Sequence, residues 1–228
     1  MMRLIMLLPL AAWTTLPLAA ADSATPDVVL ARMRQAQSSV ETLTARLEQM
    51  KSYPQLGIED PRERGTFTMA RSKRGATRVR MEIREPETRI LTVADGKYLL
   101  YQPRIKQAVE GNVSGGGKKG LFSGILTGSP EALDELDREY RVENVGETVL
   151  SDVSVIELRF IAQPNAAVYC QQIDLWVDAT SWLPVQQSCH EANQSVITFT
   201  LGEVKLNVPL SKNAFDVELP SDVEKVRG

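Results

Sequence analysis

Residue types that carry out catalysis or bind metals are scarce in this 228-residue chain, and their spacing is unfavourable. The single histidine, His190, directly follows Cys189. Neighbouring residues of a strand point to opposite faces of a sheet, so these two side chains form a poor catalytic dyad. One histidine and two cysteines also supply too few ligands for a typical zinc site. We therefore interpret His190 as a surface or strand-edge residue, and we predict no metal site and no cofactor.

Two further patterns fail as catalytic motifs when they are compared residue by residue. The segment GNVSGGGKKG, 111–120, has Asn112 where a phosphate-binding loop needs its first glycine, and Lys119 where that loop needs a magnesium-binding Ser or Thr. Glu131 and Glu135 lie on one solvated face of a predicted helix, and no serine lies in a nucleophile elbow. The sequence therefore favours a binding protein over an enzyme, and we interpret the glycine-rich segment as a flexible linker.

The first 21 residues have the pattern of a secretory signal peptide. Arg3 supplies the positive start, an apolar run follows from Leu4 to Leu18, and Ala19–Ala21 provides small residues before a cleavage site. The run is short and contains two prolines, which argues against a membrane anchor. No cysteine lies near the cleavage site, so we expect no lipid attached there. We predict that residues 1–21 are removed and that residues 22–228 form one soluble, exported domain.

The remaining composition is that of an ordinary globular protein, with 43% hydrophobic residues, 24% charged residues and a net charge of -3. The basic residues are scattered and do not alternate with aromatic ones, which argues against nucleic-acid binding. No later run of about 18 apolar residues could span a membrane. The length suits a single core, and we expect a monomer.

The two cysteines, Cys170 and Cys189, are predicted to form a disulfide, because an exported protein meets oxidising conditions. They flank two predicted strands joined by the sequence DATS. A four-residue loop would place the cysteines directly opposite each other. The alternating apolar residues favour a five-residue loop instead, and a bulge between the loop and the cysteines could satisfy both. The register therefore stays open at this point.

The periodicity of the chain predicts one opening helix followed by many strands. Thr25, Pro26 and Asp27 are typical of a helix start, and this helix should end near 37–39. From Val40 the apolar period changes to alternation, which predicts a strand over 40–53. A hairpin is expected within 65–86, with its turn around 73–75, and further strands at 90–94, 97–102, 138–150, 153–162, 166–177, 183–189 and 194–207.

Two short helices, 120–126 and 129–136, are predicted to interrupt the strand series after the segment 106–120. Antiparallel strands connected in sequence form a meander, and so few helices can cover only one side of it. The predicted fold is therefore α+β: a strongly curved antiparallel sheet or incomplete barrel, with helices across its concave face.

The hairpins in the first half of the chain share one apolar face. Asp95-Gly96 predicts a tight two-residue turn, which pairs Val93 with Tyr98 and Leu91 with Leu100. The residues assigned to this face are Leu43, Leu47, Phe67, Met69, Val79, Met81, Ile83, Leu91, Val93, Tyr98 and Leu100. Alternation alone leaves two interpretations open, a packed core and the wall of a ligand cavity.

Arg71 breaks the apolar pattern, because it continues the face of Phe67 and Met69. Its guanidinium could simply extend to solvent at the strand end. Alternatively, its five donors could hold the backbone carbonyls of a lid or the anionic head group of a ligand.

Four segments together resemble the family of periplasmic outer-membrane lipoprotein carriers known as LolA. VETLTARLEQ resembles the family's first strand, with Leu43, Ala45, Leu47 and Gln49 in alternation. GTFTMAR resembles its glycine-led strand, so that Arg71 takes the position of the family's functional arginine. REPETRILTVADGKYLLYQP and FDVELPSDVEKV are similar to its central hairpin and to its closing segment.

This resemblance implies an incomplete barrel whose apolar cavity holds acyl chains beneath a helical lid. The lid would be Leu121 to Leu136, with Leu121, Phe122 and Ile125 facing the cargo and Arg71 bonded to the lid. The partners implied are an inner-membrane transporter that releases the lipoprotein and an outer-membrane acceptor.

The chain departs from the family pattern near Met81, where an expected aromatic residue is missing, and in YLLY, where Leu stands for Trp or Phe. The cargo therefore stays open between a lipoprotein, another envelope lipid and a polyketide-like pigment. The alternative function is an envelope sensor or assembly subunit that uses the same fold to bind a protein partner.

Overall fold

The computed structural model describes residues 25–71, 77–112 and 130–228, and these contain one large sheet and two helices. The helices are α1 (Pro26–Ser38) and α2 (Pro130–Glu139), and two short 3-10 turns are η1 (Pro54–Leu56) and η2 (Pro103–Ile105). The strands are β1 (Thr42–Tyr53), β2 (Ile58–Glu59), β3 (Glu63–Arg71), β4 (Thr77–Glu85), β5 (Arg89–Ala94), β6 (Lys97–Gln102), β7 (Gln107–Asn112), β8 (Tyr140–Leu150), β9 (Val153–Ala162), β10 (Cys170–Asp178), β11 (Pro184–Glu191), β12 (Val196–Leu206) and β13 (Glu224–Arg227).

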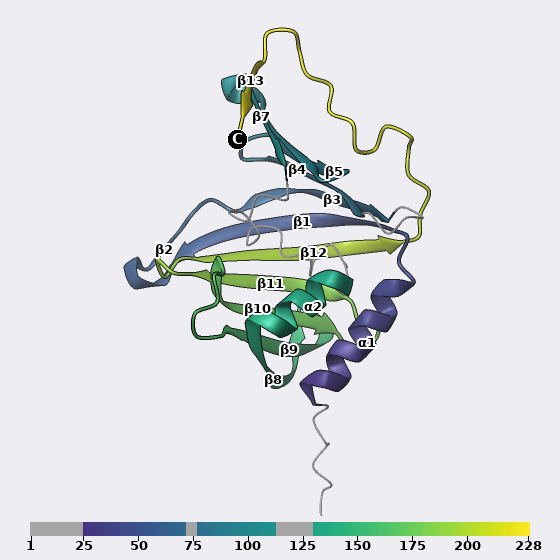
Figure 1. The fold of residues 1–228 in the computed structure, drawn as a ribbon, viewed down its shortest axis with the longest axis vertical. Coiled ribbons are helices and arrows are strands. Elements are labelled where there is room, and N and C mark those ends of the chain that lie inside the picture. The colour runs from purple at the N-terminus through teal and green to yellow at the C-terminus, as the bar shows by residue number, and fades with distance from the viewer. Residues whose placement is uncertain (1–24, 72–76, 113–129) are drawn as a thin grey trace, which may run out of the picture.

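The sheet consists of two antiparallel meanders joined side by side (Figure 1). Its strand order is β13-β7-β6-β5-β4-β3-β1-β12-β11-β10-β9-β8, with the short β2 paired to β1. One meander runs from β1 outward to β7, and the other starts at the opposite edge with β8 and returns to β1 through β12. The curved, mainly antiparallel sheet with few helices confirms the predicted α+β class.

The hairpins of the first meander have the predicted register. Met69 pairs with Val79 and Phe67 with Met81, while Val93 pairs with Tyr98 across the Asp95-Gly96 turn. Asp95 and Gly96 both adopt positive φ, 52° and 74°, as a type I′ turn requires. The prediction that 106–120 interrupts the strands is wrong for its first half, because Gln107–Asn112 form β7. The three consecutive glycines lie outside the described residues.

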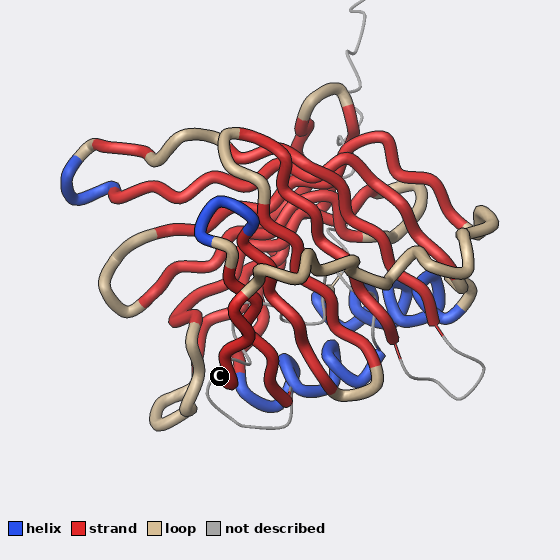
Figure 2. The backbone as a smooth tube through the Cα atoms, turned by 90° about the horizontal axis from the view of Figure 1, so that it is seen from above, coloured by secondary structure: helices blue, strands red, loops and turns tan. Residues whose placement is uncertain are grey.

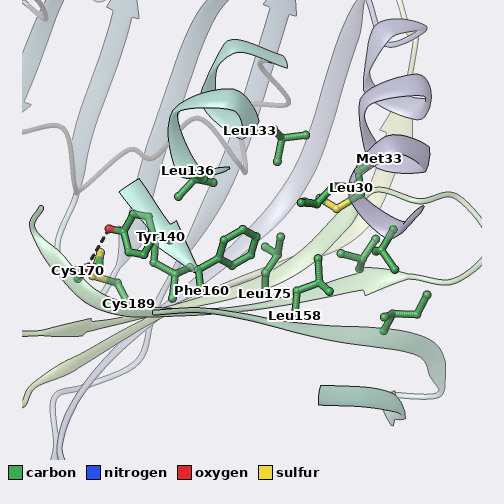
Figure 3. Packing of buried hydrophobic residues seen from close by; sticks show 14 residues of the cluster. Leu30, Met33, Leu133, Leu136, Tyr140, Leu158, Phe160, Cys170, Leu175 and Cys189 are labelled. Atoms are coloured by element: carbon green, nitrogen blue, oxygen red, sulfur yellow. Dashed lines mark hydrogen bonds between the residues drawn. A yellow bond between two sulfur atoms is a disulfide. The ribbon is translucent and has the colours of Figure 1, made fainter. Parts of the chain in front are cut away.

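Helix α1 begins as predicted, with Thr25 extended, Pro26 in the first turn and Asp27 beside it. The buried side of α1 packs against α2 and against one face of β8–β11 (Figures 1 and 3). Both helices cover this face, which we call the inner face of the sheet. We call the apolar residues packed there the helix-covered cluster. It contains Val29, Leu30, Met33, Leu133, Leu136, Tyr140, Ile156, Leu158, Phe160, Cys170, Ile173, Leu175, Val177 and Cys189.

The predicted disulfide between Cys170 and Cys189 is present, with the two Cα atoms 5.3 Å apart. Both registers considered from the sequence are wrong, because Cys170 lies opposite Glu191 and Cys189 lies opposite Ile173. The reason is that the β10–β11 ladder shifts twice, once near each end, and each bulge inserts one residue. The cysteines are diagonal neighbours, and their disulfide belongs to the helix-covered cluster (Figure 3).

The segment between β12 and β13 crosses the outer face of the first meander (Figures 1 and 2). Phe215 is buried there against the guanidinium of Arg78, which lies 4.7 Å from the ring centre. Arg80 donates a hydrogen bond of 2.7 Å to the backbone oxygen of Asp216. The chain then ends in β13, which pairs with β7 in parallel. The residue pattern predicts no strand at this position.

Gly65, the first residue of the segment GTFTMAR, occupies a position in β3 that has no room for a side chain. A Cβ atom at Gly65 would lie 1.9 Å from the backbone oxygen of Glu82, next to the bulge in the β3–β4 ladder. Backbone cannot move aside as a flexible side chain can. We expect Gly65→Ala to lower the free energy of unfolding by about 2 kcal/mol, measured by chemical denaturation. Gly202→Ala in β12 is the control, because its nearest neighbour, Arg46 Nη2, lies at 3.4 Å; equal stability of the two variants would contradict this explanation.

Candidate functional site

The apolar face predicted from the sequence is one continuous buried cluster, which we call the wall cluster. It contains Val40, Leu43, Ala45, Leu47, Phe67, Met69, Val79, Met81, Ile83, Leu91, Leu183, Ile197, Phe199 and Leu201. The remaining three predicted strand residues, Val93, Tyr98 and Leu100, are partly buried and pack against it. The structure therefore brings together all eleven strand residues that the sequence assigned to this face.

Strand β12 completes the wall cluster in a way that the sequence analysis missed. Phe199 and Leu201 lie opposite Gln49 and Leu47 of β1. Cys189, in the helix-covered cluster, lies opposite Ile197, in the wall cluster. Residues directly opposite each other in a ladder point to the same face, so the two clusters form one inner surface.

The described part of the predicted lid covers a different area from the one expected. Leu133 and Leu136 of α2 are buried in the helix-covered cluster, over β8–β10, and not over the hairpin of β5 and β6. The expected cover residues Leu121, Phe122 and Ile125 lie outside the described residues. The second predicted helix is therefore confirmed, while a lid over the wall cluster remains a prediction.

Arg71 lies at the end of β3, at one end of the wall cluster. It pairs with Thr77, its backbone N–H donates to Glu41 O over 2.8 Å, and its side chain is half-buried. This location agrees with the alternation that placed a guanidinium beside the apolar face. The ligand or lid contact that the resemblance implies for this side chain remains a prediction.

The opposite end of the wall cluster carries a charged rim that the sequence analysis did not identify. Glu63 lies opposite Gln49, and Arg89 lies opposite Ile83, on the inner face. The Arg89 guanidinium donates to the Glu63 carboxylate and, over 3.4 Å, to Gln49 Oε1. This rim borders a pocket of about 370 Å³ lined by Glu63, Pro86, Glu87, Thr88, Arg89, Gln102, Arg104 and Ile105. The wall is therefore apolar in its middle and charged at both ends.

A second ion pair continues the rim onto the other meander. The buried carboxylate of Glu191 accepts a 2.8 Å hydrogen bond from Lys51 and further bonds from the hydroxyls of Tyr169 and Ser195. Burial alone raises the pKa of Glu191. The hydrogen bonds from Lys51 and Ser195, together with the charge of Lys51, outweigh burial and hold that pKa below its usual range.

His190 lies on the outer face of the sheet, away from Cys189. Its Nε2 is 2.7 Å from Asp174 Oδ2, and Arg159 Nε donates to Asp174 Oδ1 over 2.7 Å. Burial raises the pKa of Asp174, but the bonds from His190, Arg159 and Gln172 bring it below the usual range. The expected separation of His190 from Cys189 is confirmed, and the described residues contain no group of three or more His, Cys, Asp or Glu side chains that could hold a metal ion.

Gln37 is a buried polar residue that the sequence analysis passed over. It lies on the buried stripe of α1, one turn after Met33, and its side chain is 0% exposed. Neither Nε2 nor Oε1 has a hydrogen-bond partner among the residues that the structure describes. Burying such groups unpaired costs about 1–3 kcal/mol each. The detectable signal was a glutamine at a stripe position that the helical period assigns to an apolar residue.

Comparison with protein families gives a clear assignment. The model described as "Outer membrane lipoprotein carrier protein LolA" matches residues 38–218. The chain belongs to the LolA family. A search of curated proteins found no match. In the part of the chain that the structure describes, no helix is long and apolar enough to cross a membrane.

Solved structures share the LolA-like fold at low sequence identity. An uncharacterized conserved protein from Thermus thermophilus is 13% identical, with a TM-score of 0.56 over 89% of this chain and 98% of that one. MucB is 11% identical, with a TM-score of 0.54 over 88% of this chain and 64% of that one. The MucA/MucB complex of Pseudomonas aeruginosa gives 12% identity and a TM-score of 0.51, over 87% of this chain and 62% of that one. The chain thus spans less than two thirds of MucB.

The rim pair Lys51–Glu191 should make the stability of the protein depend on pH. Because the folded pKa of Glu191 is lowered, its contribution is present above the unfolded pKa of about 4.3 and is lost as pH falls through the folded value. We expect Lys51→Met to lower the free energy of unfolding by about 1–3 kcal/mol at pH 7. Below about pH 4, the difference in this free energy between the parent and the variant should become smaller. Denaturant unfolding from pH 3 to 8 measures it.

The control for this experiment is Lys225→Met. Lys225 lies 3.6 Å from Glu110, and both side chains are exposed. Exposed pairs contribute roughly 0–1 kcal/mol, so this variant should differ little from the parent. A Lys51→Met variant as stable as the control at pH 7 would show that the rim pair is not stabilising.

Proposed function

We propose that this LolA-family protein is a periplasmic carrier that shields the acyl chains of a lipoprotein, or of a related envelope lipid, and delivers them to the outer membrane. The observation that supports the proposal is the wall cluster, a continuous apolar inner face in a chain of this family. Residues 22–228 would act as one carrier domain after removal of the leader.

The energetics of such a carrier need no chemical step. Each methylene group withdrawn from water contributes about 0.8 kcal/mol, so even a short acyl chain is held strongly. An acceptor site of similar polarity can take the chain at little net cost. A carrier therefore needs apolar area and a way to open, and it needs no catalytic residues.

The charged ends of the wall cluster suggest how cargo would be oriented. Arg71 at one end could hold an anionic head group or the carbonyls of a lid, as the resemblance implies. The rim of Glu63 and Arg89 at the other end would keep polar parts of the cargo in water. We propose that an inner-membrane transporter loads the protein and an outer-membrane acceptor unloads it.

The direct test is to purify the mature protein from its native envelope and to identify extracted molecules by mass spectrometry. The proposal expects an acylated lipoprotein or an envelope lipid to co-purify in near-stoichiometric amount. If nothing co-purifies and a fluorescent hydrophobic dye finds no internal site, the carrier function is wrong.

A charge placed on the wall cluster should weaken binding of an apolar probe. Leu100 and Leu99 are both half-buried neighbours in β6, but only Leu100 packs against the wall cluster. We expect Leu100→Lys to weaken binding of the uncharged apolar dye Nile red by about tenfold or more, since an ammonium group would have to lose water.

Leu99→Lys is the matched control, because it makes the same change on the outer face of the same strand. Its dye affinity should stay within about twofold of the parent, with both variants checked for folding by circular dichroism. Equal loss in both variants would mean that the dye does not bind at the wall cluster.

The alternative function is binding of a protein partner by the same fold. The structure of MucB in complex with MucA(peri) shares the fold, with a TM-score of 0.51, and supports this alternative. This alternative would be favoured if a protein co-purifies without lipid and if an acylated probe does not compete with that protein for binding.

A further inference from the structure

The amide of Gln37 lies at the boundary between the two apolar clusters. Met33, one helical turn earlier, and Leu30, two turns earlier, belong to the helix-covered cluster. On the other side, Val40 belongs to the wall cluster and Ala36 packs against it. Gln37 itself is fully buried and belongs to neither cluster.

The sheet is also polar at this boundary. Gln187 of β11 is buried between Leu175, which belongs to the helix-covered cluster, and Phe199, which belongs to the wall cluster. Buried amides therefore mark the transition between the clusters on the helix and on the sheet. An apolar residue at position 37 would continue the stripe of α1 and leave no unpaired group, so the packing of this helix does not account for the glutamine.

We propose that Gln37 recognises the amide linkage of an acylated ligand whose chain lies along the inner face. This inference rests on the carrier function proposed above and specifies the ligand that the site takes. Both side-chain atoms are inaccessible in this structure, so the ligand reaches them when α1 and the sheet separate at the boundary.

The chemistry of the unpaired atoms selects an amide over an ester. Gln37 offers one NH₂ donor and one carbonyl acceptor, and both lack partners among the described residues. A secondary amide supplies the complementary C=O and N–H and can pair with both. An ester of the same shape has only acceptors, so it would pair with Nε2 and leave Oε1 buried and unpaired. A site of this kind rejects the analogue that lacks the hydrogen-bonding group.

The test compares two probes of equal length, N-methyldodecanamide and methyl dodecanoate, in displacement of a bound fluorescent dye from the mature protein. The parent protein should bind the amide about tenfold more tightly than the ester. Gln37→Leu should lose this preference while retaining ester binding. Gln35→Leu, the same change on the exposed side of α1, should keep it.

The outcomes separate the two proposals. Binding of neither probe to the parent protein would overturn the carrier function itself. Binding of both probes with equal affinity, or a preference that survives Gln37→Leu, would overturn only the role of Gln37. If Gln37→Leu does not fold, Gln37→Met keeps the length of the side chain and provides the same comparison.

Discussion

The pairing of β1 with β12 is the constraint on which the rest of the structure depends. It joins two meanders that would otherwise be separate sheets, and its ladder runs from Leu43 opposite Leu206 to Ser52 opposite Val196. Because opposed residues share a face, this ladder fixes which side chains of both halves point inward. Without it the wall cluster would lose Phe199 and Leu201, and the two apolar clusters would not be contiguous.

The distribution of polar groups on the inner face follows from the same ladder. Its middle is apolar, while Glu63, Arg89, Lys51 and Glu191 lie toward one end, because β1, β3, β5 and β11 each change from apolar to charged residues toward that end. Ion pairing lets these groups remain partly buried beside apolar side chains. The polar network around Asp174 lies on the other face, so it does not border the surface that is proposed to bind lipid.

Local features could be predicted from the sequence, and features set by distant residues could not. The Asp95-Gly96 turn and the alternation around Phe67 and Met69 fixed the hairpins of the first meander, because turn chemistry and side-chain period act over a few residues. The β1–β12 pairing and the parallel strand β13 depend on segments more than 100 residues apart. The two bulges of β10–β11 shifted the register around Cys170 without any marker in the residue pattern, and Gln37 was overlooked in the last turn of a helix.

The short strand β13 also limits how two molecules of this protein can associate through the edges of their sheets. It covers β7 and replaces that edge with four residues, Glu224–Arg227, three of which are charged. Short, charged edges resist pairing with another chain. Among the described strands, β8 then remains as the long edge, with Val145 and Val149 exposed along it. Growth of a fibril by edge-to-edge addition requires two competent edges per molecule, so association through β8 would stop at a pair.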